Sequence, residues 1–340
     1  MSKATGVVQF SEAIGHAKDT HDSVAVLLGN GFSIDFDPVF SYDSLAEKAD
    51  LARLHCDSES LFTSLDSPSF ELAIERLRRA ARIISLYEDD PEISDLLHAD
   101  AEVIRHALPT ALAELHPQKS TVVDPKLYAS AQDFLSHFSE YFTLNYDILL
   151  YWTLMSSGHR PFRRDDGFRG ANGDLAWQRT PAQNVHYLHG ALHLFQELDG
   201  TLRKLSYSRD GALVNAVKNR IEADEFPLFV SEGTCTAKAE FVERHPYLRE
   251  AHRRLRAGRG ALFLHGVSLS EHDDHIFELI EDPDCDIETL YVGIHGSARK
   301  RSTRHTRQRA NLISERRREN GGRDLDVRFY DSASANVWRD

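Results

Sequence analysis

Residues 24–33 combine a strand-forming run with a turn that could hold phosphate. The apolar run Val24–Leu28 is typical of a buried strand in a parallel sheet, and it leads into Gly29-Asn30-Gly31-Phe32-Ser33. The two glycines allow positive φ and let a ligand approach the backbone closely. Backbone N–H groups of such a turn bind phosphate, so we predict an anion-binding loop. The alternative is an ordinary turn, because the third glycine of the G-x-G-x-x-G fingerprint is absent.

A second set of polar residues follows the β-prone segment Tyr141–Leu144. Asn145 and Asp147 leave this strand directly before an apolar helix that begins near Ile148. Polar groups at the carboxyl end of a strand lie where α/β proteins bind their ligands. We therefore predict that both side chains face a ligand site, with helix capping by one of them as the structural alternative.

His189 lies at the end of a third short strand, residues 185–190, directly before Gly190. A histidine titrates near neutral pH, which suits general base catalysis. The nearby His186 and His193 are interpreted as structural. We expect His189 to meet the other polar groups, because the carboxyl ends of parallel strands share one edge of a sheet.

A fourth strand, Ala261–His265, ends in the Gly266-Val267-Ser268 segment, and a helix follows it. Glu271, His272 and His275 at the start of that helix could be metal ligands. However, the helical zinc motif needs histidines four residues apart, and His272 and His275 are three apart. Acidic residues also favour a first helical turn in any helix. The sequence therefore predicts no metal site, and its three cysteines, which form no C-x-x-C pair, predict no zinc ribbon or disulfide framework.

These motifs alternate with helical segments along the whole chain. About six or seven strands separated by helices predict an α/β fold, a Rossmann-like open, mostly parallel sheet with helices on both faces. We expect a single domain over residues 1–340 with a helical insertion at about 55–139. A long loop spans 156–183, and a basic helix at about 298–320 precedes a final strand. The expected strands are residues 24–28, 141–144, 185–190, 226–230, 261–265, 287–293 and 326–330. Residues 191–195 and 202–207, joined by an acidic turn near Asp199, are expected to form a β-hairpin.

The charge of the chain limits its partners. The formal net charge is −13, which argues against nucleic acid as a general partner. The basic segment 299–318 is the exception: it could contact nucleic acid or an acidic protein surface, or simply pair with the acidic remainder of the chain. No apolar run is long enough to span a bilayer, and the N-terminus lacks the apolar core of a signal peptide. We expect a cytoplasmic protein without membrane contact.

Taken in order, the four motifs resemble those of the sirtuin-like NAD-binding family. Sirtuins carry Gly-Ala-Gly-x-Ser, then Thr-Gln-Asn-x-Asp, then a catalytic His-Gly and a later Gly-x-Ser loop. Here Leu144 replaces the glutamine, and the four zinc cysteines of protein-deacylating sirtuins are missing. The chain is more similar to the zinc-less bacterial branch that hydrolyses NAD in antiphage defence. It also resembles a closely related, poorly characterised family with a Gly-Asn-Gly-Phe-Ser start and a Tyr-Leu-His-Gly-Ala-Leu-His centre.

This resemblance implies an NAD glycohydrolase that releases nicotinamide and ADP-ribose, with NAD as substrate and no metal. It implies that Asn145 positions the ribose and the attacking water, and that His189 contacts the ribose hydroxyls or acts as general base. Asp147 would accept the nicotinamide carboxamide N–H. The turn at residues 29–33 would hold the pyrophosphate, while Gly266 and Ser268 would bind the adenosine ribose and phosphate. Glu232 is a weaker match to the family's substrate segment.

Two other functions use the same loops. The chain could be a sensor that binds NAD or ADP-ribose without turnover, or it could pass the ADP-ribosyl group to a protein or acyl acceptor. An unrestrained NAD hydrolase would be toxic to its own cell, so we expect a regulatory partner or a homo-oligomer. The sequence does not identify the trigger.

Overall fold

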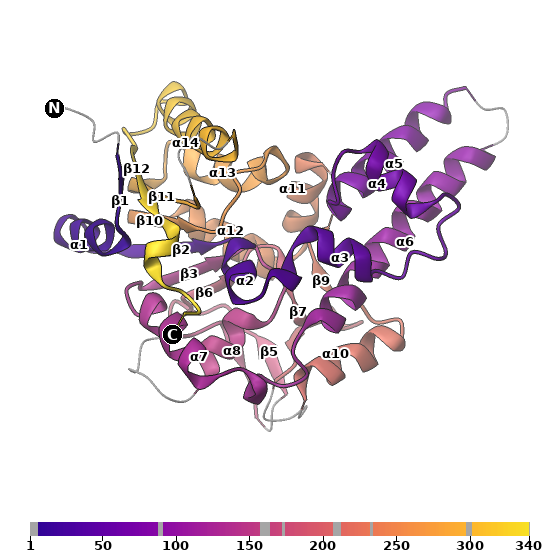
Figure 1. Ribbon diagram of the computed structural model, residues 1–340, viewed down its shortest axis with the longest axis horizontal. Coiled ribbons are helices and arrows are strands. Elements are labelled where there is room, and N and C mark those ends of the chain that lie inside the picture. Colours follow the sequence, from indigo (N-terminus) through magenta and orange to yellow (C-terminus); the bar gives the residue numbers. More distant parts are fainter. Residues whose placement is uncertain are drawn as a thin grey trace.

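The computed structural model describes residues 6–87, 91–156, 164–171, 174–206, 212–231, 234–296 and 301–339. Its centre is a seven-stranded, all-parallel sheet (Figure 1). This confirms the predicted α/β fold with an open parallel sheet. From one edge to the other, the strands are β1 (Val7–Val8), β12 (Asp326–Asp331), β11 (Asp286–Ile294), β10 (Arg259–His265), β2 (Val24–Leu28), β3 (Glu140–Thr143) and β6 (Val185–Tyr187).

Helices cover both faces of this sheet, because alternate residues of each strand point to opposite sides. In β2, Val24, Val26 and Leu28 pack in one core with α1 (Phe10–Thr20) and α7 (Pro125–Leu135). Ala25 and Leu27 of the same strand belong to a second core. The helices of that second core are α12 (Pro246–Arg256), α13 (Asp274–Glu281) and α14 (Arg301–Glu319).

A second, antiparallel sheet lies beside the first, and the sequence pattern does not predict it as a separate unit. Its order is β4 (Phe168–Arg169), β5 (Leu175–Trp177), β8 (Leu202–Lys204), β7 (Gly190–Gln196) and β9 (Pro227–Phe229). The prediction that the strand near 226–230 joins the parallel sheet is wrong, because β9 pairs with β7 instead. Pro227 lacks an N–H group, which suits the edge position that β9 holds. The segment 156–183, predicted as a loop, contributes β4 and β5.

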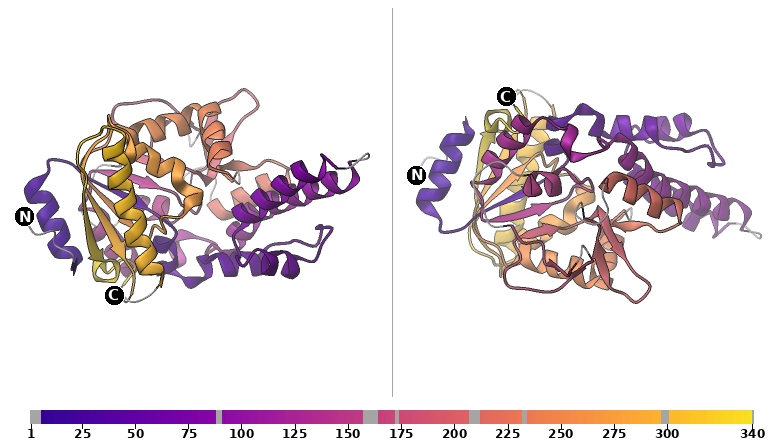
Figure 2. Two further views of the ribbon diagram at one scale, coloured as in Figure 1. Left: turned by 90° about the horizontal axis from the view of Figure 1, so that it is seen from above. Right: turned by 90° about the horizontal axis from the view of Figure 1, so that it is seen from below.

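The chain between β2 and β3 is helical. Helices α5 (Phe70–Ile84) and α6 (Glu92–Leu115) form a long hairpin that extends away from the sheet in every view (Figures 1 and 2). Apolar residues at helical spacing bury the inner face of α5, and the Ser69 side chain caps its first turn. The elements of this segment are α2 (Gly31–Phe36), η1 (Pro38–Phe40), α3 (Tyr42–Lys48), α4 (Ser58–Ser64), α5 (Phe70–Ile84), α6 (Glu92–Leu115), η2 (Ser120–Val122) and α7.

The remaining elements connect the two sheets and complete the outer layers. They are α8 (Leu149–Met155), α10 (Leu213–Glu222), α11 (Cys235–Arg244), η3 (Glu271–Asp273) and η4 (Ser332–Ala335). No helix in the described part of the chain has both the length and the apolar character needed to cross a bilayer.

Candidate functional site

A cavity of about 500 Å³ lies at the carboxyl ends of the parallel strands. The strand order reverses here: the chain runs outward from β2 to β3 and β6, and later from β10 to β11 and β12. Such a switch point is where open α/β sheets bind ligands. Residues directly after six strands line the cavity, among them Gly29, Asn145, His189, Gly266, His295 and Ser332.

The glycine turn after β2 packs against the Gly266 loop after β10. The Gly29 N–H donates to the His265 carbonyl and the Gly31 N–H to the Gly266 carbonyl, both at 2.9 Å. A Cβ on Gly31 would lie 2.5 Å from the Gly266 Cα, and a Cβ on Gly29 would lie 2.6 Å from the Gly266 oxygen. Both glycines are therefore required by the contact between the two loops.

This contact also changes the predicted phosphate cradle. The N–H groups of Phe32 and Ser33 donate to the carbonyls of Gly29 and Asn30 at the start of α2. Together with the bonds of Gly29 and Gly31, four of the five N–H groups assigned to phosphate already have protein partners. Asn30 lines the cavity, and its side chain donates to the Phe40 carbonyl.

We expect Gly31→Ala to lower the free energy of unfolding by about 3 kcal/mol or more, because the new methyl group meets backbone that cannot yield easily. Gly15→Ala is the matched control. A methyl group on Gly15, which lies in α1, would have open space around it to 4 Å, so alanine should stabilise the protein by about 0.5–1 kcal/mol. Denaturant unfolding followed by circular dichroism measures both, and equal effects would contradict the role given to Gly31.

Asn145, Ser33 and Asp147 form a buried hydrogen-bond chain. Ser33 Oγ donates to Asp147 Oδ2, and Asn145 Nδ2 donates to Ser33 Oγ at 2.9 Å. Asp147 Oδ1 also accepts from the Leu149 N–H at 2.8 Å, which satisfies the first N–H group of α8, although Ile148 holds the N-cap position of this helix. Burial raises the pKa of Asp147 above its ordinary value, while the bonds from Ser33 and Leu149 act in the opposite direction.

The donor and acceptor roles in these hydrogen bonds fix the orientation of the Asn145 amide. When Asp147 is ionised it only accepts hydrogen bonds, so Ser33 must donate to it and accept from Asn145 Nδ2. The Asn145 Oδ1 atom is then left buried and without a hydrogen-bond partner among the described residues, and Asn145 itself lines the cavity. A buried carbonyl oxygen in this state is a strong acceptor for a ligand hydroxyl or water.

Some of the other residues predicted to bind the ligand line the cavity, and some are buried in the core. Gly266 and Ser268 line the cavity with Asn30. Phe32 and Ser33 are fully buried behind the wall. Phe32 packs on Trp338, whose indole N–H donates to the Phe32 carbonyl at 2.9 Å. Glu232 lies outside the described residues.

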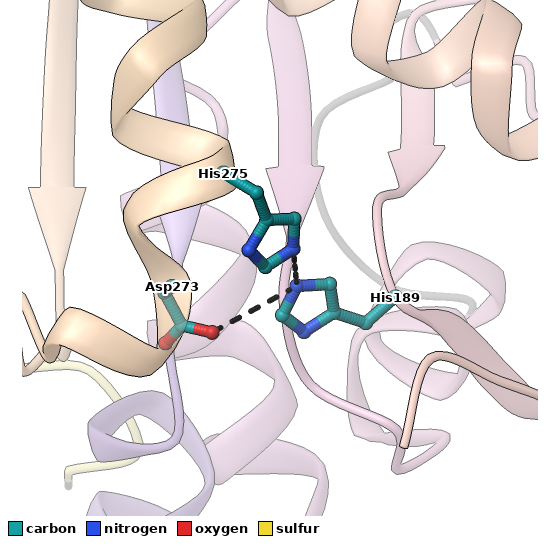
Figure 3. Close-up of side chains that lie close together, drawn as sticks. All are labelled: His189, Asp273 and His275. Atoms are coloured by element: carbon teal, nitrogen blue, oxygen red, sulfur yellow. Dashed lines mark hydrogen bonds and ion pairs between the residues drawn. The ribbon is translucent and has the colours of Figure 1, made fainter. Parts of the chain in front are cut away.

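His189 sits on the cavity wall at the junction of the two sheets, between β6 and β7. Its Nε2 atom lies 3.1 Å from Nε2 of His275 and 3.9 Å from Oδ1 of Asp273 (Figure 3). The other ring nitrogen of His189 points away from His275 (Figure 3). Burial, and then the charge of Lys238, hold the pKa of both histidines well below the ordinary value, so both rings are neutral at pH 7.

Lys238, Glu71 and Asp273 form a buried ion cluster next to the two histidines. Lys238 Nζ on α11 lies 2.6 Å from Glu71 Oε2 on α5 and 3.4 Å from Asp273 Oδ1. Burial lowers the pKa of Lys238, but the two carboxylates outweigh it and the net pKa is raised. The Tyr146 hydroxyl lies 3.0 Å from Glu71 Oε1 and 2.7 Å from the Val230 carbonyl. The cluster ties the helical insertion to the site.

Sequence reasoning misses this cluster and the partner of His189. The sequence groups His275 with Glu271 and His272 on its own turn, whereas the structure groups it with His189 and Asp273. No local signal connects positions 86 residues apart. The chain between β2 and β3 also supplies an unpredicted apolar wall beside the polar groups, made by Phe40, Leu45, Phe70, Leu108 and Leu112.

The family model described as "Domain of unknown function (DUF4917)" matches residues 26–338. The chain belongs to this family. The match begins within β2 and ends at Trp338, which packs on Phe32. It therefore includes every residue that lines the cavity. Among curated proteins, no sequence matches this DUF4917 chain.

Proposed function

We propose that this DUF4917 protein is an NAD glycohydrolase, which cleaves the bond between nicotinamide and ribose with water. One observation carries the proposal: Asn145, with its unpaired carbonyl oxygen, and His189 share the wall of one cavity at the sheet's switch point. The cavity volume of about 500 Å³ falls in the range of small-molecule sites. The order of the four motifs, which resembles that of sirtuin-like proteins, supports the same reaction.

In this proposal the dinucleotide lies across the strand ends. The adenosine half meets Gly266 and Ser268, and the pyrophosphate passes the Asn30 turn. The nicotinamide ribose then lies at Asn145, whose Oδ1 accepts from a ribose hydroxyl or from the attacking water. Asp147 acts through Ser33 to hold the Asn145 amide in this orientation, because it accepts from Ser33 Oγ, which in turn accepts from Asn145 Nδ2.

The reaction breaks the bond between C1′ and the nicotinamide nitrogen and joins a water oxygen to C1′. Nicotinamide takes the bonding electrons, so its ring loses its positive charge and needs no acid. The water proton passes to a base. His189 serves this role through Nδ1 when its Nε2–H donates to His275. Because burial lowers its pKa, His189 is neutral and this nitrogen is free to accept a proton, but the same shift makes it a weaker base than a free imidazole. Positioning therefore supplies most of the remaining rate.

Nicotinamide release from NAD by purified protein tests the proposal, with His189→Ala beside the wild type. We expect release by the wild type and a loss of about a hundredfold or more in the variant. Release that survives His189→Ala at the wild-type rate would overturn the assignment of the site. Mass spectrometry of the products separates hydrolysis, which yields free ADP-ribose, from transfer to a protein acceptor.

Calorimetric titration with NAD distinguishes the hydrolase from a sensor. Binding without nicotinamide release would favour a module that holds NAD or ADP-ribose without turnover. Absence of both binding and release would reject the nucleotide site altogether. Activity that depends on protein concentration would indicate self-association, which is one form of the restraint that such an enzyme needs.

A further inference from the structure

Three potential metal ligands converge at one point of the cavity wall. His189 approaches from the junction of β6 and β7, Asp273 from η3, and His275 from the first turn of α13 (Figure 3). One ligand atom of each, Nε2 or a carboxylate oxygen, lies within 4.8 Å of the other two. His189 and Asp273 also line the cavity, so a bound ion would face it.

We propose that Nε2 of His189, Nε2 of His275 and Oδ1 of Asp273 bind one transition-metal ion, for which Zn²⁺ is the best fit. Zinc takes nitrogen ligands at about 2.0–2.1 Å, and tetrahedral geometry then separates neighbouring ligand atoms by about 3.3 Å. The observed separations are 3.1 Å between the two nitrogens and 3.9 Å from His189 to the carboxylate. Small side-chain shifts would close the site.

The protonation states of the two histidines favour metal binding. Both histidines are neutral at pH 7, so protons do not compete with the ion for the ring nitrogens. Binding requires only that the proton between the two Nε2 atoms moves to Nδ1 of its ring. Two imidazoles and one carboxylate select Zn²⁺, Co²⁺ or Ni²⁺ over Mg²⁺ and Ca²⁺, which prefer oxygen ligands.

The surrounding charges permit a cation. Lys238 lies 3.4 Å from Asp273 Oδ1 and repels an ion there, but Glu71, at 2.6 Å from Lys238, offsets that charge. A third buried histidine, His252, stacks at 6.0 Å from the His275 ring and is not a ligand. Its Nε2–H donates to the Leu188 carbonyl at 3.0 Å.

Zinc at this position would block the proposed base, and this step alone rests on the proposed NAD hydrolase activity. With a metal on Nε2, His189 carries its proton on Nδ1 and can no longer act as a base. We therefore expect Zn²⁺ to inhibit nicotinamide release. A metal would be one form of restraint on the enzyme.

Metal binding is tested directly, without NAD. Protein freed of metal by a chelator is titrated with Zn²⁺ by calorimetry and with Co²⁺ by visible absorption. We expect one ion per chain, tetrahedral Co²⁺ bands without thiolate charge-transfer absorption, and no heat with Mg²⁺. His275→Ala should weaken Zn²⁺ binding at least about tenfold. His272→Ala is the matched control, because His272 is on the adjacent turn, outside the ligand group, and its variant should bind as the wild type does.

Two outcomes would overturn the metal site: no stoichiometric Zn²⁺ binding by the wild type, or equal binding by the wild type and His275→Ala. The wild-type titration and Co²⁺ spectrum decide the question even if the His275 variant does not fold. A protein that binds zinc but releases no nicotinamide would reject the hydrolase and keep the metal site. A protein that releases nicotinamide but binds no zinc would reject the metal site and keep the hydrolase.

Discussion

Asn145→Ala is expected to lower the rate of nicotinamide release by about a hundred- to a thousandfold. The substitution removes an unpaired, buried acceptor on the cavity wall that faces the reacting sugar in the proposed complex. Loss of a single preorganised polar group from an enzyme site has effects of this size, because the group meets the transition state without reorganising. The kinetic constant kcat should carry most of the loss, while KM changes less.

Ser33→Ala is the companion variant for this prediction. It deletes the hydroxyl that joins Asp147 to Asn145 and leaves the Asn145 side chain intact. We expect a smaller loss, about tenfold, because the amide remains present but is no longer held in one orientation. Steady-state kinetics and thermal melting of both variants provide the measurement. Wild-type kcat in folded Asn145→Ala would remove Asn145 from the mechanism.

Acid is expected to destabilise the protein between pH 7.5 and pH 5, and three buried histidines are expected to contribute about 6 kcal/mol of this loss. These histidines are His116, His193 and His265; all three are buried, and His265 also lines the cavity. Burial lowers the pKa of His116 to about 3 and that of His265 to about 4, with a further small effect of His295 on the latter. Burial also holds the pKa of His193 well below its ordinary value.

The sign follows from proton binding. Below an unfolded pKa of about 6.5 the unfolded chain binds protons that the folded protein rejects, so acid favours unfolding. Each histidine then loses about 1.4 kcal/mol per pH unit, or about 2 kcal/mol by pH 5. The contribution is complete above about pH 6.5 and is lost as the pH falls toward the folded pKa values. Protonation of His116 would also break the bond that its Nε2 accepts from the Ile148 N–H at 3.1 Å.

His193→Phe isolates one of these contributions. Neither ring nitrogen of His193 has a hydrogen-bond partner among the described residues, and its ring packs between Tyr151 and Tyr187. A phenyl ring keeps an aromatic contact and cannot be protonated. We expect the difference in unfolding free energy between pH 7.5 and pH 5 to shrink by about 2 kcal/mol. Urea unfolding at several pH values measures it, and an unchanged pH dependence would show that His193 is accessible to protons in the folded state.

Much of the architecture is predictable because its signals are local. The apolar run Val24–Leu28 needs only its own residues to form a buried strand, and the parallel arrangement follows from the alternation of strands and helices. Two short strands are harder to predict. Strand β1 has only two residues, too few for a pattern, and β9 joins the second sheet because β7 offers it a partner there. Pairing partners depend on tertiary packing and not on local propensity.

Local sequence is enough to identify the residues that end the parallel strands, and therefore the loops that surround the cavity. Asn145, His189 and Gly266 are predictable at this edge because parallel strands place all their carboxyl ends on one side. The partners of these side chains emerge only in the folded protein: Ser33 lies with Asn145, 112 residues apart, and His189 with His275, 86 apart. These contacts depend on how α2 and α13 pack against the sheet, and helix packing is set by the shape of the whole core, which no short segment encodes.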